Sequence, residues 1–388
     1  TPASAAPDGE PWVVSLGDSY ISGEAGRWAG NESFTTADID ALGPAAYWDA
    51  GGGESIERCH RSKSAAIHIG VVKSLNLACS GAITSTKFDS KGRFKPGIDF
   101  YEDGNRKGQA LMLQEFASDH NVKMVALSIS GNDFKFEPIF VQCVKDFLVP
   151  VLSPKCKNNE TVQGYLSASA QERVRGNTAQ AILNVAQAME NAGYADSDWT
   201  LVLQLYPQPL PMSSDMRYGE FGYSRQYDGG CGLRDADLDW ALSSVLPMIN
   251  STYRGAASDA QAKRPTLQVA VMDTSKAFRG RELCQKGVDR VGSGNGPRTW
   301  QEPGAVDRSE WAMEINLINV NDTYQQESMH PNYWGQLALR NCWRQVWNDG
   351  DVRGGACVRG AGGLTANCEP DMTLVPSGRA AFRVVTMP

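Results

Sequence analysis

The chain has 388 residues, of which 41% are hydrophobic and 21% are charged, and its 37 basic and 44 acidic side chains give a net charge of −7. This length allows a large core, in two or three domains or in one elaborated α/β domain. No segment approaches the roughly 20 consecutive apolar residues of a membrane-spanning helix. Because the acidic excess also argues against nucleic-acid binding, we expect a globular protein with neither a membrane span nor a nucleic-acid partner.

The start of the chain and its cysteines favour an exported protein. Residues 1–10 are small, polar or proline, and we expect them to be a disordered mature N-terminus. Nine cysteines are well separated and form no CxxC pair, which favours disulfides over zinc or redox motifs. Three pairs would close modest loops: Cys59 with Cys79, Cys143 with Cys156, and Cys231 with Cys284. Cys342, Cys357 and Cys368 cannot all pair with one another, so their pairing stays open.

Short apolar runs that end in turn residues predict buried parallel strands. In chain order they are residues 11–19, 73–82, 123–133, 199–209 and 266–273. Helical patterns lie between or after them, at 108–120, 172–192 and 334–347. Strands that alternate with helices imply right-handed crossovers and a sheet covered on both faces. We therefore predict a three-layer α/β/α sandwich with a central, mostly parallel five-stranded sheet.

Long connections interrupt this pattern and are predicted to be irregular segments that shape a pocket rim. They are residues 24–58, 83–107, 134–171, 208–233 and 279–312. We expect residues 11–347 to form one domain with long loop insertions. Residues 348–388 are predicted to be a Gly-rich appendage packed on the same domain, with a hairpin-like pair of short strands at 373–385.

Polar clusters follow the first three predicted strands, where open α/β sheets place their ligands. They are Gly17-Asp18-Ser19, Ser80-Gly81 and Gly131-Asn132-Asp133, and a fourth cluster, Glu327 to Pro331, precedes the last helix. One serine, one histidine, one side-chain amide and several loop amides are the parts of an acyl-transfer site.

At these four clusters the sequence resembles the SGNH or GDSL family of serine hydrolases, most closely its secreted actinobacterial esterases and lipases. The four blocks occur in the family's order between residues 11 and 347. The resemblance implies an SGNH, flavodoxin-like hydrolase domain with Ser19 as nucleophile and His330 as general base. It also implies an oxyanion hole formed by Ser19, Gly81 and Asn132.

The third member of the triad departs from the family pattern. The family places an aspartate three residues before the histidine, and here that position is Glu327. Either Glu327 orients His330, as glutamates do in other triads, or it points elsewhere and a backbone carbonyl orients the ring. Asp322 is a weaker alternative.

Each residue also has a plain structural interpretation. Ser19 could be a helix N-cap, Gly81 could supply backbone freedom, Asn132 could form a turn, and His330 could be a surface histidine. The presence of all four blocks together favours the catalytic interpretation. The other histidines, His60, His68 and His120, lack metal-ligand spacing, and we expect neither a metal nor a cofactor.

The sequence therefore predicts a secreted, monomeric serine esterase or lipase that hydrolyses carboxylic esters through an acyl-enzyme on Ser19. Its substrate would be a small-molecule ester, a lipid or an acylated sugar. Two alternatives stay open. The same residues could serve an acyltransferase or a deacylase of a sugar or secondary metabolite, or the scaffold could be a non-catalytic secreted binding protein.

Overall fold

A computed structural model describes residues 6–32, 36–149, 155–316 and 322–377 of the chain. Among these residues, seven strands form one central sheet and two small hairpins lie outside it. The strands are β1 (Trp12–Gly17), β2 (Lys73–Asn76), β3 (Lys87–Phe88), β4 (Phe94–Lys95), β5 (Glu102–Asp103), β6 (Arg106–Lys107), β7 (Val122–Ser128), β8 (Thr200–Gln204), β9 (Val269–Asp273), β10 (Gly355–Leu364) and β11 (Pro370–Pro376).

The strand order of the central sheet is β2-β1-β7-β8-β9-β10-β11, and every neighbouring pair except β10 and β11 is parallel. After β1 the chain forms β2, which pairs with one side of β1, and it then forms β7, which pairs with the other side of β1. This reversal makes the boundary between β1 and β7 a topological switch point, where the loops after the strands diverge and leave room for a ligand. The fold thus directs the segments after β1 and β7 toward one place.

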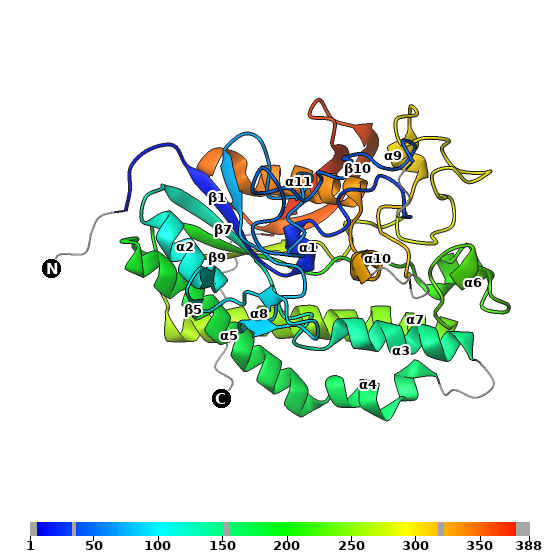
Figure 1. The fold of residues 1–388 in the computed structure, drawn as a ribbon, viewed down its shortest axis with the longest axis horizontal. Helices are drawn as coiled ribbons and strands as arrows, with labels where there is room; N and C mark the ends of the chain where they lie inside the picture. The colour runs from blue at the N-terminus through cyan, green and yellow to red at the C-terminus, as the bar shows by residue number, and fades with distance from the viewer. Residues whose placement is uncertain (1–5, 33–35, 150–154, 317–321, 378–388) are drawn as a thin grey trace.

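Helices cover both faces of the sheet (Figure 1). Alternate residues of β1 face opposite sides. Val14 and Leu16 pack with α2 (Gln109–Ala117), α5 (Ala168–Asn191) and α8 (Leu246–Lys263), whereas Val13 packs with α11 (Tyr333–Trp347). The predicted three-layer sandwich is therefore confirmed. The helices are α1 (Ser19–Ser22), α2 (Gln109–Ala117), α3 (Phe136–Leu148), α4 (Glu160–Tyr165), α5 (Ala168–Asn191), α6 (Ser224–Tyr227), α7 (Asp235–Trp240), α8 (Leu246–Lys263), α9 (Ala305–Arg308), α10 (Asp322–Glu327) and α11 (Tyr333–Trp347).

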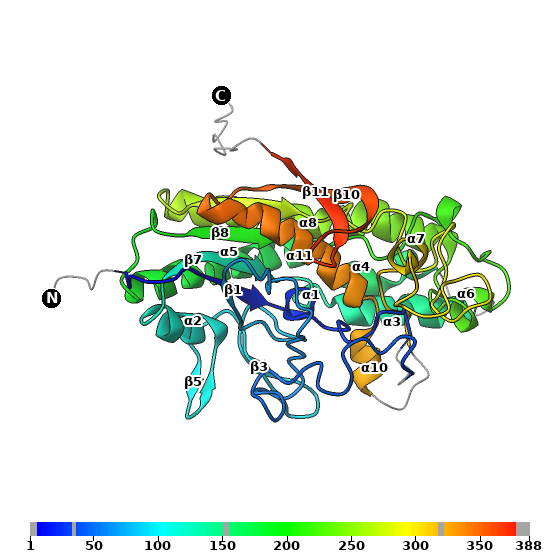
Figure 2. The same cartoon turned by 90° about the horizontal axis from the view of Figure 1, so that it is seen from above.

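All five predicted strands are present, as β1, β2, β7, β8 and β9, and the Gly-rich tail adds two more strands to the same sheet. β10 pairs in parallel with β9, and β11 closes the edge of the sheet as its antiparallel partner (Figure 2). The expected hairpin at 373–385 is therefore displaced toward the N-terminus, and residues 378–388 lie outside the described part. A disulfide between Cys342 of α11 and Cys357 of β10 links this edge to the helix layer.

A second difference lies in the connection 134–171, which contains α3 and α4 instead of irregular chain. Apolar side chains of α3, including Ile139, Val144 and Phe147, are buried in a third cluster with Leu246 and Ile249 of α8. This cluster extends past the carboxyl ends of the strands. The insertion therefore builds a wall beside the site.

Three further disulfides join Cys59 to Cys79, Cys143 to Cys156 and Cys231 to Cys284, the pairs expected from the sequence. Cys368 is an exposed free thiol. Among the described residues, we find no helix with the length and apolar character that crossing a membrane requires.

Candidate active site

Ser19 and His330 meet at the switch point. The Ser19 hydroxyl lies 2.6 Å from Nε2 of His330, although 311 residues separate them in sequence. Ser19 is the first residue of α1, and the carboxylate of Asp18 caps this short helix by accepting the Tyr20 N–H at 3.1 Å. Ser19 is buried and His330 is partly buried, so their contact is shielded from bulk water.

The backbone before Ser19 requires glycine. Gly17 has φ +136°, and a Cβ atom there would lie 1.9 Å from the main-chain oxygen of Ser128 in β7. No other residue fits this close approach. The close approach of Gly17 to its partner Ser128, at the ends of the paired strands β1 and β7, lets the chain turn directly into α1 and presents Ser19 at the edge of the sheet.

The histidine loop is held from two sides. The Tyr20 hydroxyl donates a hydrogen bond to the carbonyl oxygen of Met329 at 3.0 Å, and the Tyr20 ring lies 4.7 Å from the His330 ring. On the other side, the N–H of Met313 donates to the carbonyl oxygen of His330 at 3.0 Å. Tyr20 therefore supports the His330 imidazole, which contacts the neighbouring Ser19.

The environment of His330 favours its neutral form. Burial lowers the pKa of His330 below 6.5, opposed by the charge of Glu24 and by the main-chain carbonyl groups of Glu327 and Ser328. Nε2 faces Ser19, while Nδ1 has no hydrogen-bond partner of ordinary geometry in the described part of the chain. The carbonyl oxygen of Glu327 does accept the main-chain N–H of His330, at 3.2 Å.

Glu327 does not reach His330 with its carboxylate. Its two oxygens accept hydrogen bonds from the Tyr47 hydroxyl at 2.7 Å and from the Trp28 indole N–H at 2.8 Å. The longer glutamate side chain is thus buried away from the imidazole, which corrects the expectation of a direct Glu327–His330 contact. The side chain of Asp322, the weaker alternative, lies outside the described residues.

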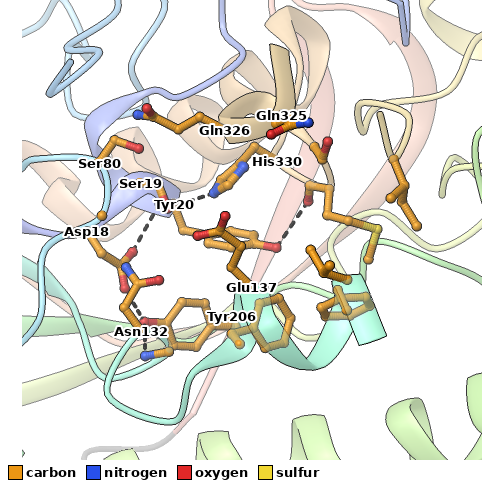
Figure 3. A pocket seen from close by; sticks show the side chains of 18 of the residues that line it. Asp18, Ser19, Tyr20, Ser80, Asn132, Glu137, Tyr206, Gln325, Gln326 and His330 are labelled. Carbon is orange, nitrogen blue, oxygen red and sulfur yellow. Dashed lines mark hydrogen bonds between the residues drawn. The ribbon is translucent and has the colours of Figure 1, made fainter. Parts of the chain in front are cut away.

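The three residues predicted to bind the oxyanion, Ser19, Gly81 and Asn132, line one cavity of about 500 Å³ together with His330 (Figure 3). Gly81 has φ +80°, a conformation that side chains rarely adopt. The side-chain amide of Asn132 is anchored, because it donates to the carbonyl oxygen of Ala82 at 2.9 Å. The loops after β1, β2 and β7 therefore contribute to the same site.

Away from Ser19, the same cavity is mainly apolar. The apolar side chains of this part come from α3, from α8 and from two other positions, and they are Phe136, Phe140, Val141, Leu148, Leu246, Ile249, Ile315 and Met329. Glu137 and Lys145, both exposed, are the charged residues that α3 adds to the lining. A ligand would thus meet polar groups at one end and hydrocarbon at the other.

A buried polar cluster lies behind the polar end of this cavity, and the sequence did not predict it. It consists of Glu24, His60 and Glu327, whose ligand-type atoms all lie within 4.8 Å of one another. Although this spacing would suit a metal ion, donors of the protein already occupy the carboxylate oxygens. We therefore describe the cluster as a hydrogen-bonded ion-pair network. The sequence signal for it was a lone acid, Glu24, in a run of small residues after Ser19.

Comparisons with known proteins find similar solved structures at low sequence identity. No family model and no curated protein matches the chain. Solved structures that match include an extracellular lipase from Streptomyces rimosus, with 16% identity and a TM-score of 0.43 over 88% of this chain and 99% of that one.

Two further solved structures match the chain, also at low sequence identity. They are a phospholipase A1 from Streptomyces albidoflavus, with 18% identity and a TM-score of 0.41 over 88% and 99% of the two chains, and a carbohydrate acetylesterase from Sinorhizobium meliloti, with 10% identity and a TM-score of 0.27 over 68% and 84%. The fold and the grouping of the four sequence blocks around one cavity agree with the resemblance to SGNH or GDSL hydrolases.

Proposed function

We propose that this protein is a serine hydrolase of carboxylic esters, with Ser19 as nucleophile and His330 as general base and acid. The observation that carries the proposal is the 2.6 Å contact between the Ser19 hydroxyl and Nε2 of His330. A serine hydroxyl is a weak nucleophile at neutral pH unless an adjacent base takes its proton. Burial lowers the pKa of His330, so that the imidazole is neutral and able to accept this proton.

In the proposed reaction, Ser19 attacks the ester carbonyl and His330 accepts the proton and returns it to the departing alcohol. Water then attacks the acyl-enzyme, with His330 again as base, and releases the acid. The proposed orienting group for the ring is the main-chain carbonyl of Glu327, which raises the pKa of His330, in place of the Glu327 carboxylate. The buried position of the Glu327 carboxylate between Tyr47 and Trp28 supports this choice.

The negative charge that develops on the carbonyl oxygen needs donors fixed in advance. We assign this role to the main-chain N–H groups of Ser19 and Gly81 and to the side-chain amide of Asn132. Ser19, Gly81 and Asn132 all line the cavity, and the contact with Ala82 holds the Asn132 amide in place. Loss of one such donor typically raises the barrier by about 2.7 to 4 kcal/mol.

The apolar part of the cavity favours an ester with a hydrocarbon acyl chain over an acetylated sugar. A sugar would bring hydroxyl groups that need hydrogen-bond partners, whereas α3 and α8 supply Phe140, Val141, Leu246 and Ile249. Burying each CH₂ group of an acyl chain there contributes about 0.8 kcal/mol. We therefore propose a lipase-like or aliphatic esterase specificity. Four disulfides among the described residues support export to an oxidising compartment.

A fluorophosphonate probe tests the proposal, because it labels only an activated serine. We expect the wild type to be labelled and to hydrolyse 4-nitrophenyl octanoate, and Ser19→Ala to do neither while unfolding at the wild-type temperature. Ser15→Ala is the matched control, since Ser15 of β1 is also buried but bonds to Asn76. A folded wild type that is never labelled would favour a non-catalytic binding protein.

A further inference from the structure

The carboxylate of Glu24 is fully buried behind the polar end of the cavity and contacts three segments. Oε1 lies 2.6 Å from Nδ1 of His60. Oε2 accepts hydrogen bonds from the Ser80 hydroxyl and from the side-chain amide of Gln326, the latter at 2.8 Å. Glu24 itself follows α1, and its N–H donates to the carbonyl oxygen of Ser19 at 3.3 Å. One carboxylate therefore connects the nucleophile segment to three others.

Two of these contacts reach the parts of the site that must stay aligned. Ser80 directly precedes Gly81, and its N–H donates to the carbonyl oxygen of Cys59 at 3.0 Å. Gln326 belongs to α10, four residues before His330. Both Ser80 and Gln326 line the cavity around Ser19 (Figure 3). A shift of Glu24 would therefore move both the proposed oxyanion loop and the histidine loop.

We propose that Glu24 is a positioning residue of the proposed ester hydrolase. Through Ser80 and Gln326 it keeps Gly81 and His330 aligned with Ser19, and its negative charge stabilises the imidazolium of His330 through space. This inference rests on the proposed function. The Glu327 carboxylate is turned toward Tyr47 and Trp28 and does not contact the imidazole. The proposal assigns the stabilisation of the imidazolium charge to Glu24, a carboxylate outside the histidine loop.

The electrostatics agree with this geometry. Burial by itself would raise the pKa of Glu24, but the charge and hydrogen bond of His60 lower it to about 2, so that the carboxylate is ionised near neutral pH. Its charge in turn raises the pKa of His330 against the effect of burial. Charges act over longer distances in a buried site than in water. The titratable groups around the Glu24–His60 pair are Tyr47, Glu54, Arg58, Lys95, Glu327 and His330.

Glu24→Gln tests the proposal because it keeps the size of the side chain and removes its charge. For 4-nitrophenyl octanoate we expect kcat to fall by about 10- to 100-fold with KM changed by less than about twofold. We also expect the acidic limb of the pH profile of kcat/KM to move to lower pH, because the imidazolium loses a nearby negative charge. A merely structural role would not move that limb.

Glu54→Gln is the matched control. Glu54 accepts the N–H groups of Arg58 and His60 in the same loop, but it contacts neither Ser80 nor Gln326. We expect its kcat to stay within about twofold of the wild type. Equal losses in Glu24→Gln and Glu54→Gln would overturn the proposal, because they would mean that the loop as a whole needs its carboxylates.

A titration of His330 by NMR separates this inference from the proposed function, because it needs no substrate. The His330 signal is assigned by its absence in His330→Gln. We expect a lower pKa of His330 in Glu24→Gln than in the wild type, and an unchanged pKa together with an unchanged kcat would overturn the proposal. An inactive wild type whose His330 still responds to Glu24→Gln would contradict only the proposed function. If Glu24→Gln does not fold, Ser80→Ala decides: we expect kcat to fall at least about threefold, and a wild-type kcat would refute the proposal.

Discussion

The buried carboxylate of Asp18 accepts a hydrogen bond from the hydroxyl of Tyr206, which joins the segment after β1 to the segment after β8. The same hydroxyl accepts the main-chain N–H of Gly131 at 2.8 Å. One tyrosine therefore sets the spacing between the loop that carries Ser19 and the loop that carries Asn132.

Tyr206→Phe removes both hydrogen bonds and leaves Asp18 buried with one donor fewer. We expect the free energy of unfolding to fall by about 1 to 3 kcal/mol and kcat to fall by about tenfold or more, since the Asn132 loop loses its anchor. Urea denaturation and ester hydrolysis measure the two effects. Tyr218→Phe is the control, because the Tyr218 hydroxyl donates to an exposed carbonyl oxygen, that of Asp228. Comparable effects in the two variants would contradict this prediction.

Glu327→Gln distinguishes a carboxylate from a carbonyl as the orienting group of His330. Because the Glu327 side chain faces Tyr47 and Trp28, we expect kcat to stay within about tenfold of the wild type, whereas His330→Ala should lose about 10³-fold or more. Steady-state kinetics of the two variants compare these losses directly. If Glu327→Gln lost as much activity as His330→Ala, the carboxylate would have to act on the ring after all.

The pH profile of kcat/KM should report His330. Only its neutral form accepts the Ser19 proton, so activity rises with pH through the pKa of His330. Because burial lowers this pKa, we expect the half-maximal value below pH 6.5. Measurement with a neutral ester avoids titration of the substrate. A midpoint of the kcat/KM profile above the ordinary pKa of histidine would mean that the charge of a nearby carboxylate outweighs the effect of burial on His330.

Val141→Trp should shorten the acyl chain that the site accepts. Val141 lines the apolar part of the cavity on α3, so a larger side chain there would displace the end of a long chain and leave a short one unaffected. We expect the ratio of kcat/KM for octanoyl and acetyl esters to fall by about tenfold or more. Val149→Trp, at the exposed end of the same helix, should leave the ratio unchanged. A constant ratio in Val141→Trp would place the acyl chain elsewhere.

Stability should be greater in mild acid than in mild base. Burial raises to about 7 the pKa of five acids, which are Asp18, Glu282, Glu310, Glu314 and Glu327. Their unfolded values are near 4, so between about 4 and 7 the native state binds more protons than the unfolded state. The free energy of unfolding must then fall as pH rises through this window, by up to about 1.4 kcal/mol per pH unit for each proton.

Urea denaturation at about pH 5 and about pH 8 measures this difference. The lowered pKa values of His68 and His330 make the free energy of unfolding rise with pH, which reduces the expected difference between the two pH values. Glu314→Gln removes one of the raised acids and should make the dependence on pH smaller. A chain that is more stable at the higher pH would contradict the raised pKa values.

Several elements follow from local patterns because the interactions that form them are local. The apolar run before Ser19 predicts β1, and the turn residues at its end predict a loop at the sheet edge. The same logic identifies the segments that end at Gly81 and Asn132. The parallel arrangement follows from the alternation with helices, since a short βα unit has essentially one way to pack.

The composition of the Gly-rich tail misled the prediction at the other edge. Gly355 to Leu364 looks like a flexible segment, yet it forms β10 because β9 offers an open edge and the disulfide Cys342–Cys357 holds it there. α3 was missed for a related reason: its buried face joins a cluster with residues from distant segments, among them Leu246 and Ile249 of α8. The local sequence shows neither the strand beside β10 nor the cluster beside α3.

The sequence by itself determined the layered fold, the position of Ser19 at the end of a strand and the position of His330 before the last helix, because hydrophobic periodicity and turn chemistry act between near neighbours. Only the tertiary structure decided where Glu327 points and that Glu24 lies behind the site, because the partners of a buried carboxylate, here Tyr47, Trp28, His60 and Ser80, come from distant segments. A carboxylate stays buried only where donors meet it, and the folded chain alone brings those donors together.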